Sequence, residues 1–184
     1  MIFLFSYSIY SLSIAIVLFF KKKVCRKKNP NLLKMTETYK FKVVLLGEGR
    51  VGKTSLLLRF VENRFSDRQQ STLQASYLEK TINIGSCSVT LAIWDTAGQV
   101  YKGKNTLRKI DFLKLKKKER FHALAPIYYR DADGAILVFD ITDQTSFNKV
   151  QNWVEELRKI VGDDILVVVA SNKQDLESKR QVRK

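Results

Sequence analysis

The chain has 184 residues, of which 45% are hydrophobic and 28% charged, and this is enough for one α/β domain with a buried core. Its net charge of +15 is concentrated in residues 1–34 and 100–118, so the remainder is nearly neutral and we expect no nucleic-acid-binding surface. Two cysteines are too few for a disulfide framework or a zinc cluster, which fits a reducing, cytosolic setting.

Residues 1–20 form an uncharged, mainly apolar run that is followed directly by a cluster of lysines and arginines. As a helix, such a run would rise ~30 Å, enough to cross the hydrocarbon core of a bilayer. Positive charges after the run predict a signal anchor, with residues 21–38 as a basic linker on the cytosolic side. Cys25 is then a candidate for palmitoylation. The alternative is that residues 1–34 reflect a mis-assigned start and the working chain begins at Met35.

A glycine-rich loop follows the first expected core strand, residues 41–46. Residues 47–54 fit the pattern G-x-x-x-x-G-K-[ST], in which backbone N–H groups wrap a phosphate. The helix expected over 52–63 adds its positive end. Lys53 is expected to pair with the β- and γ-phosphates, and Thr54 to bind Mg²⁺. The loop residues predicted to bind nucleotide are Gly47, Gly49, Arg50, Val51, Gly52, Lys53, Thr54 and Ser55. The alternative is a glycine-rich turn without a ligand.

Two further strands are expected over 78–84 and 88–94, and a second motif follows them. Asp95 supplies a carboxylate for the metal side, Gly98 a backbone N–H, and Gln99 an amide that can orient a water molecule. Beside a phosphate-binding loop, this combination predicts phosphoryl transfer to water.

The second half of the chain predicts two buried parallel strands, 135–140 and 165–171, joined by a helix. Apolar residues recur at helical spacing from Phe147 to Val161, and Gly162 ends the helix. Alternating strands and helices predict a doubly wound, mostly parallel sheet. In such sheets ligands bind at the carboxyl ends of the strands, where the motifs fall.

A third motif, residues 172–175, identifies the base. A carboxylate such as Asp175 accepts hydrogen bonds from guanine N1–H and N2–H₂, a donor pair that adenine lacks. The sequence therefore predicts guanine nucleotides as ligands.

Together these motifs resemble the Rab group of Ras-like small GTPases, and most closely its early-endosomal branch, over residues 39–99 and 119–182. The resemblance implies a P-loop small-GTPase fold and Mg²⁺-dependent hydrolysis of GTP to GDP and phosphate. It further implies a switch in vesicle trafficking on the cytoplasmic face of an endomembrane such as the early endosome. Exchange factors, GTPase-activating proteins and effectors are the implied partners.

The resemblance also assigns roles to residues. Thr72 would contact Mg²⁺ and the γ-phosphate, Phe65 would pack on guanine, and Asp95 would hold Mg²⁺ through a water. The Gly98 N–H would sense the γ-phosphate, and Gln99 would orient the attacking water. In the third motif Asn172 and Asp175 would read guanine, and Lys173 would brace the loop. Tyr77, Trp94 and Tyr128 match an effector-facing aromatic triad, and the alternative is that Trp94 and Tyr128 are ordinary core or strand-surface residues.

The chain departs from the family pattern in two places. Nineteen residues, 100–118, separate Gln99 from Glu119, so the GTPase domain expected over 39–184 carries a basic insertion inside its second switch. Its composition and its Val and Lys ends suggest the hypothesis of a translated intron, which transcript reads containing the stretch at full abundance would refute. The family also continues beyond Asp175 with a further strand and helix, so we expect a C-terminally truncated domain of reduced stability.

The sequence is also compatible with two functions other than that of an active GTPase. One is a non-catalytic GTP/GDP binder, because small displacements of a water-orienting group such as Gln99 are costly. The other is a membrane-attached basic protein that carries a defective GTPase fragment.

Overall fold

The computed structural model describes residues 2–5, 37–70, 72, 75–84, 87–96 and 128–183. Within them lies a six-stranded sheet with the strand order β1-β6-β5-β2-β4-β3. Its strands are β1 (Ile2–Phe5), β2 (Glu37–Leu46), β3 (Ser76–Ile84), β4 (Cys87–Asp95), β5 (Gly134–Asp140) and β6 (Leu166–Asn172). Only the β3–β4 pair is antiparallel, which confirms the expected mostly parallel sheet.

The centre of the sheet is formed by strands that are buried on both faces. Every residue of β5 is buried, and β6 is buried over its five central residues. This burial explains their near-continuous apolar sequences. The first core strand begins at Glu37 rather than at residue 41, because β2 pairs with β4 from Glu37 opposite Cys87 onward.

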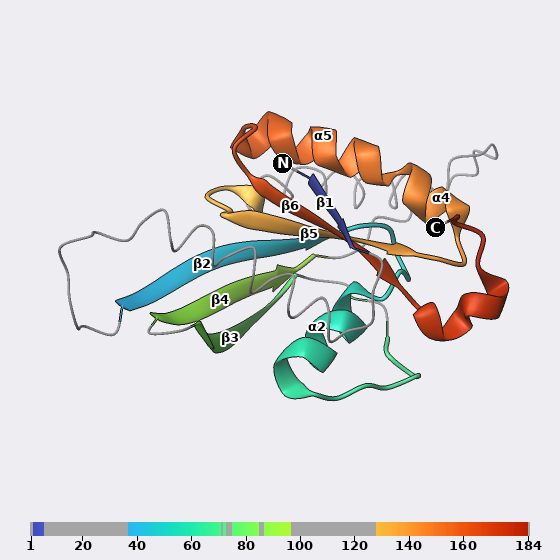
Figure 1. The fold of residues 1–184 in the computed structure, drawn as a ribbon, viewed down its shortest axis with the longest axis horizontal. Coiled ribbons are helices and arrows are strands. Elements are labelled where there is room, and N and C mark those ends of the chain that lie inside the picture. The colour runs from blue at the N-terminus through green and yellow to red at the C-terminus, as the bar shows by residue number, and fades with distance from the viewer. Residues whose placement is uncertain are drawn as a thin grey trace, which may run out of the picture.

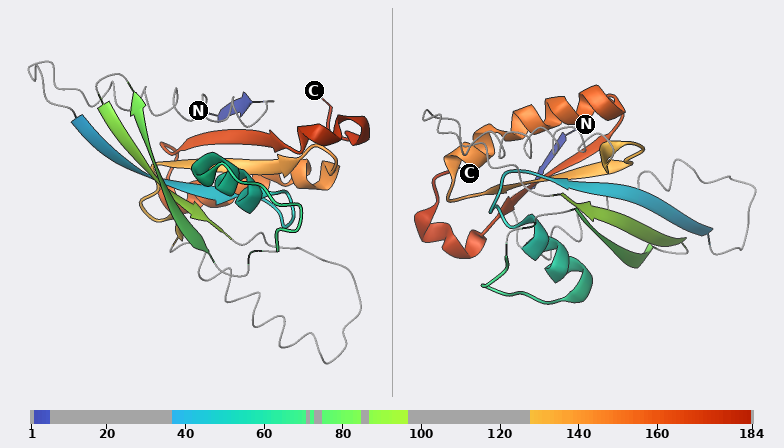
Figure 2. Two further views of the ribbon diagram at one scale, coloured as in Figure 1. Left: turned by 90° about the horizontal axis from the view of Figure 1, so that it is seen from below. Right: turned by 180° about the vertical axis from the view of Figure 1, so that it is seen from behind.

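Helices cover both faces of the sheet (Figure 1). Helix α2 (Lys53–Glu62) packs Leu56 and Leu57 against the odd-numbered core residues of β2 and their neighbours on β4. On the opposite face, α5 (Val150–Val161) packs Trp153, Val154 and Leu157 against β5 and β6. Both views of Figure 2 keep α2 and α5 on opposite sides of the sheet. This is the predicted doubly wound arrangement.

The helix expected between the last two predicted strands consists of two pieces. Helix α4 (Gln144–Asn148) begins at Asp143, whose side chain accepts a hydrogen bond from the Thr145 N–H, and α5 begins after Lys149. An Asp at this position satisfies one of the free N–H groups of the first turn. The 3-10 helix η1 (Gln174–Lys179) follows β6 directly.

The structure describes only residues 2–5 of the predicted N-terminal segment, and there it differs from the expected helix. Ile2–Phe5 is not helical but forms strand β1, which pairs in parallel with β6 from Ile2 opposite Val167 to Phe5 opposite Ala170 (Figure 1). Across the described ranges no helix is both long and apolar enough to span a membrane. The linker region, Cys25 and Met35 lie outside the described residues.

Candidate nucleotide-binding site

A cavity of about 600 Å³ opens at the carboxyl ends of the parallel strands. This volume is within the usual range for small-molecule sites. Three separate stretches line it: the phosphate loop with the start of α2, residues 65–72, and the segment after β6. The predicted residues in its wall are Gly49, Arg50, Gly52, Lys53, Thr54, Ser55, Phe65, Thr72, Asn172, Lys173 and Asp175. Two other predicted residues, Gly47 and Val51, contribute backbone carbonyls to the same network.

Two glycines of the phosphate loop have no acceptable substitute. Gly47 has a φ of 138°, and a Cβ there would lie 2.2 Å from the Val138 carbonyl oxygen. Gly52 has a φ of 90°, and its Cβ would lie 2.4 Å from Nδ2 of Asn172. Both backbone conformations are ones that residues with a Cβ rarely adopt. The loop can therefore approach β5 and residues 172–175, the base-side motif, only because glycine occupies these positions.

Lys53 is buried at the start of α2 with its ammonium group inside the loop. Its Nζ donates to the carbonyl oxygens of Gly47 and Glu48, at 2.9 Å each. Burial lowers the pKa of Lys53 to about 8, although the charges of Asp95 and Glu48 act in the opposite direction. A buried cation held only by neutral carbonyls favours an additional anion, which is the role expected of phosphate.

Three residues predicted for the metal side meet at one point. The Thr54 hydroxyl donates to Asp95 Oδ2 at 2.5 Å and lies 2.6 Å from the Thr72 hydroxyl. The other carboxylate oxygen, Asp95 Oδ1, is buried without a hydrogen-bond partner. Burial raises the pKa of Asp95, and the Thr54 hydrogen bond and Lys53 charge offset this only in part.

This donor set fits Mg²⁺ better than a metal that needs several protein ligands. Among the described residues no group of three or more His, Cys, Asp or Glu side chains converges. Magnesium is usually held by one or two carboxylates, hydroxyls, waters and substrate phosphates. The unpartnered Asp95 Oδ1 and the two threonine hydroxyls are hard oxygen donors of that kind.

The base-side motif is attached to the phosphate loop. Asn172, the last residue of β6, donates from Nδ2 to the Val51 carbonyl at 2.8 Å. Lys173 and Asp175 line the cavity beyond it. Phe65 lies in the wall with 62% of its surface exposed, so its ring is accessible to a ligand in the cavity. The two predicted ends of a nucleotide site thus belong to one cavity.

Comparison with protein families matches residues 42–110 and 116–184 to the Ras family. The chain belongs to the Ras family. Among its curated relatives is Ras-related protein Rab-21 of cattle, 58% identical over 79% of this chain and 57% of the relative. The human Rab-21 protein is 58% identical over 78% and 56%, and that of Dictyostelium discoideum is 48% identical over 80% and 61%.

These relatives confirm the resemblance to the Rab group, and the chain spans a little more than half of their length. The break in the Ras family match, between residues 110 and 116, falls inside the predicted insertion. Gly98, Gln99 and the whole of 100–118 lie outside the described residues, so the predicted catalytic glutamine stays a prediction.

The three aromatic residues predicted to face effectors form one cluster on this Ras-family domain. The rings of Tyr77 and Trp94 lie 5.1 Å apart, and those of Trp94 and Tyr128 lie 5.9 Å apart. Tyr77 is 43% exposed, and Lys42 Nζ lies 5.5 Å from the centre of the Trp94 ring. Both ring pairs are tilted, and aromatic residues of this kind are enriched at protein-binding surfaces.

Sequence reasoning missed two ion pairs around the cavity. Lys149, between α4 and α5, contacts Glu48 of the phosphate loop at 2.8 Å. Asp140, at the end of β5, contacts Lys173 of the base-side motif at 2.5 Å. An acidic residue closing an otherwise apolar parallel strand was a usable signal for Asp140, since ligands bind at those strand ends. No local pattern in the sequence pointed to the pair between Glu48 and Lys149, which are 101 residues apart.

Proposed function

We propose that this chain is a Rab-type guanine-nucleotide switch that binds GTP and GDP with Mg²⁺ and hydrolyses GTP to GDP and phosphate. The observation that carries the proposal is one cavity lined by the phosphate loop and the base-side motif, with Asp95 of the second motif hydrogen-bonded to Thr54 in its wall. Lys53 represents the phosphate motif, Thr54 with Asp95 and Thr72 the metal side, and Asn172 with Asp175 the base side. Family membership supports the same reaction.

The described residues suit binding and orientation. Lys53 would exchange its two carbonyl partners for phosphate oxygens, which restores a full counter-charge to its buried ammonium. Thr54, Thr72 and Asp95 would hold Mg²⁺, which when bound neutralises phosphate charge during transfer. Asp175 would accept from guanine, and Phe65 would cover its ring. The predicted role of Gln99 is to orient the attacking water.

Nucleotide binding tests the proposal directly. Fluorescent GTP, GDP and ATP analogues would be titrated against the full chain in Mg²⁺ and again in EDTA. We expect GTP and GDP to bind and ATP to bind at least about a hundredfold more weakly, because adenine leaves Asp175 without donors. Equal binding of ATP would contradict the assignment of the base, and no binding of any nucleotide would contradict the function.

A second candidate is a switch that binds nucleotide without hydrolysing it. The sequence observation that favours it is the insertion of 100–118 directly after Gln99. Single-turnover hydrolysis of bound GTP separates the two, with a variant lacking 100–118 as the comparison. Equal rates in both proteins would favour the enzyme, whereas hydrolysis only in the shortened variant would favour the binder.

The trafficking role rests on the family and on the aromatic cluster. Tyr77, Trp94 and Tyr128 would contact effectors, and exchange factors and GTPase-activating proteins would act on the same domain. The Rab-21 relatives favour a place on the cytoplasmic face of an endomembrane, with the early endosome as the specific proposal. Location of a tagged full chain relative to organelle markers tests this assignment.

A further inference from the structure

Asp140 is a buried carboxylate beside the base-side motif that none of the predicted roles explains. It lies at the carboxyl end of β5 with 6% of its surface exposed. One oxygen, Oδ2, pairs with Lys173 Nζ at 2.5 Å. The other, Oδ1, accepts from the Thr142 N–H at 2.8 Å and from the Thr142 hydroxyl at 2.7 Å. Both oxygens are therefore occupied, as a buried charge requires.

Its partner Lys173 occupies a strained position. Its backbone is left-handed, with φ 64° and ψ 39°, which costs free energy in a residue other than glycine. This conformation turns the chain from β6 into η1, and the Leu176 N–H donates back to the Lys173 carbonyl at 2.9 Å. The turn sets Asn172 and Asp175 on the wall of the same cavity. Whatever holds Lys173 therefore holds both predicted base contacts.

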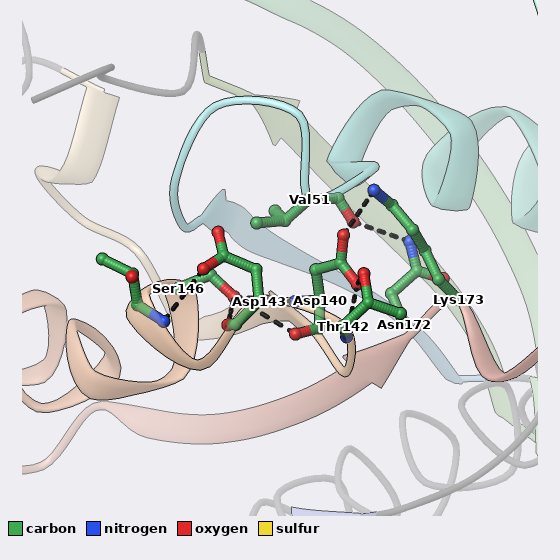
Figure 3. A network of polar contacts seen from close by, with 8 residues as sticks. Val51, Asp140, Thr142, Asp143, Ser146, Asn172 and Lys173 are labelled. Carbon is green, nitrogen blue, oxygen red and sulfur yellow. Dashed lines mark hydrogen bonds and ion pairs between the residues drawn. The ribbon is translucent and has the colours of Figure 1, made fainter. Parts of the chain in front are cut away.

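The contact joins a continuous network from β5 to the phosphate loop (Figure 3). Asp140 is opposite Asn172 in the sheet register, and the Ile141 N–H donates to the Asn172 carbonyl at 3.2 Å. Asn172 in turn donates to Val51 of the phosphate loop. Figure 3 places Asp140 between Thr142 and Lys173 in this row. Asp140 thus contacts the base-side motif through its side chain and through the strand pairing.

We propose that Asp140 is a positioning residue for guanine-nucleotide retention, which acts by holding the Lys173 side chain and with it the turn that carries Asn172 and Asp175. The inference rests on the proposed function, because it names a determinant of the same site. It concerns the base end of the nucleotide, which GDP and GTP share. Its loss should therefore affect both nucleotides alike and leave the chemical step untouched.

The test compares Asp140→Asn with Asp143→Asn in the full chain. Both changes remove one carboxylate, but Asp143 is exposed and caps α4, a position where Asn serves as well as Asp. We expect D140N to release fluorescent GDP and GTP about tenfold faster than the parent, the scale of one charged hydrogen bond. D143N should release them at the parental rate. Parental release by D140N, or equally fast release by both variants, overturns the proposal.

Two further measurements distinguish a positioning role of Asp140 from a general contribution to folding. Single-turnover hydrolysis of bound GTP should be unchanged in D140N. In a Lys173→Met background, D140N should accelerate release no further, because the group through which it acts is gone. A full additional tenfold effect in that background would show that Asp140 acts independently of Lys173 and would overturn the inference.

Amide hydrogen exchange tests the role of Asp140 in the nucleotide-free chain, independently of whether the chain binds nucleotide. In the nucleotide-free chain, D140N should speed exchange at Leu176, whose N–H closes the turn, and leave α5 unchanged. If D140N does not fold, Asp140→Glu keeps the charge, displaces it by one methylene, and should show the same local change to a smaller degree. Unchanged exchange at Leu176 in the folded variant overturns the inference. A parental chain that binds no GDP would instead contradict the proposed function.

Discussion

At the scale of single residues, the charged groups of the cavity are held in states that a nucleotide would relieve. Lys53 is buried among carbonyl oxygens, and Asp95 keeps one oxygen without a partner. Burial lowers the pKa of Lys53 and raises that of Asp95, so it disfavours the charged form of each group. Binding sites commonly carry such perturbed groups, because a charged ligand or ion supplies the missing partner.

Nucleotide affinity should fall as the pH rises through about 8, the pKa of Lys53. Above that pH Lys53 has lost its proton before the nucleotide binds, and binding phosphate must restore it. Stability changes in the opposite direction: between about 8 and 10.5 the unfolded chain holds the proton that the folded chain has lost, so unfolding becomes harder. Titrations of GDP between pH 7 and 9 measure the effect on affinity. Lys53→Arg, which stays charged throughout, is the control and should bind with a flatter pH profile.

Asp95→Asn should weaken the effect of Mg²⁺ on nucleotide release without lowering the stability of the nucleotide-free protein. The neutral amide avoids the cost of a buried, half-paired carboxylate, but it is a poorer ligand for a hard cation. The factor by which Mg²⁺ slows GDP release should be at least about tenfold smaller in this variant than in the parent. Release rates in Mg²⁺ and in EDTA provide the measurement. Asp163→Asn, at a side chain that is 92% exposed, is the control, and a full Mg²⁺ response in D95N would contradict the metal assignment.

Gly47→Ala should destabilise the domain by ~1–3 kcal/mol or more, because its Cβ would overlap the Val138 carbonyl in addition to straining the backbone. Gly162→Ala is a matched control. Its φ is 86°, and a Cβ there meets nothing within 4 Å, so it adds strain without overlap. Urea unfolding of the two variants measures the difference. An equal loss in both would mean that the close approach of the loop to β5 contributes nothing.

At the scale of elements, the periodic segments were predictable and their ends were not. The apolar runs of β5 and β6 were read correctly, since both faces of these strands are buried. The break between α4 and α5 was missed because the apolar spacing runs across it, whereas the start at Asp143 depends on a cap. The strand at Ile2–Phe5 was missed because a short apolar run is compatible with either a helix or a strand.

Strand β1 supplies the element-scale prediction. Replacing both Phe3 and Leu4 with proline should accelerate amide exchange in β6 at Val167, Val168 and Val169, because adjacent prolines remove at least one N–H that faces the partner strand. Phe3→Val with Leu4→Ile keeps strand-forming residues and is the control. Exchange in β4, which is separated from β1 by β6, β5 and β2, should be unchanged in both variants. Unchanged exchange in β6 would contradict the pairing.

At the scale of the whole molecule, the cavity joins segments that are distant in the sequence. The phosphate loop, residues 65–72 and the base-side motif each contribute to one wall. A ligand that contacts all three binds only the folded chain, and it therefore stabilises the fold in proportion to its occupancy. The stability of this Ras-family domain should accordingly depend on nucleotide.

GDP with Mg²⁺ at a hundred times its dissociation constant should raise the melting temperature by about 5–10 °C, since it adds ~2.7 kcal/mol to the free energy of unfolding. Thermal unfolding followed by circular dichroism measures the shift. ATP at the same concentration is the control and should raise the melting temperature by no more than about 2 °C, because binding a hundredfold weaker adds at most ~0.4 kcal/mol. Equal shifts with ATP and GDP would contradict guanine selectivity at the level of the whole domain.

The sequence by itself determined the fold class and most of the site, because their information is local. Residues 47–54 and 172–175 are contiguous motifs, and apolar periodicity marks the strands and helices between them. Only the tertiary structure decided that Asp140 pairs with Lys173, that Glu48 pairs with Lys149, and that β6 has β1 as its neighbour. Such contacts depend on where the chain closes its long loops, and no local pattern encodes that geometry.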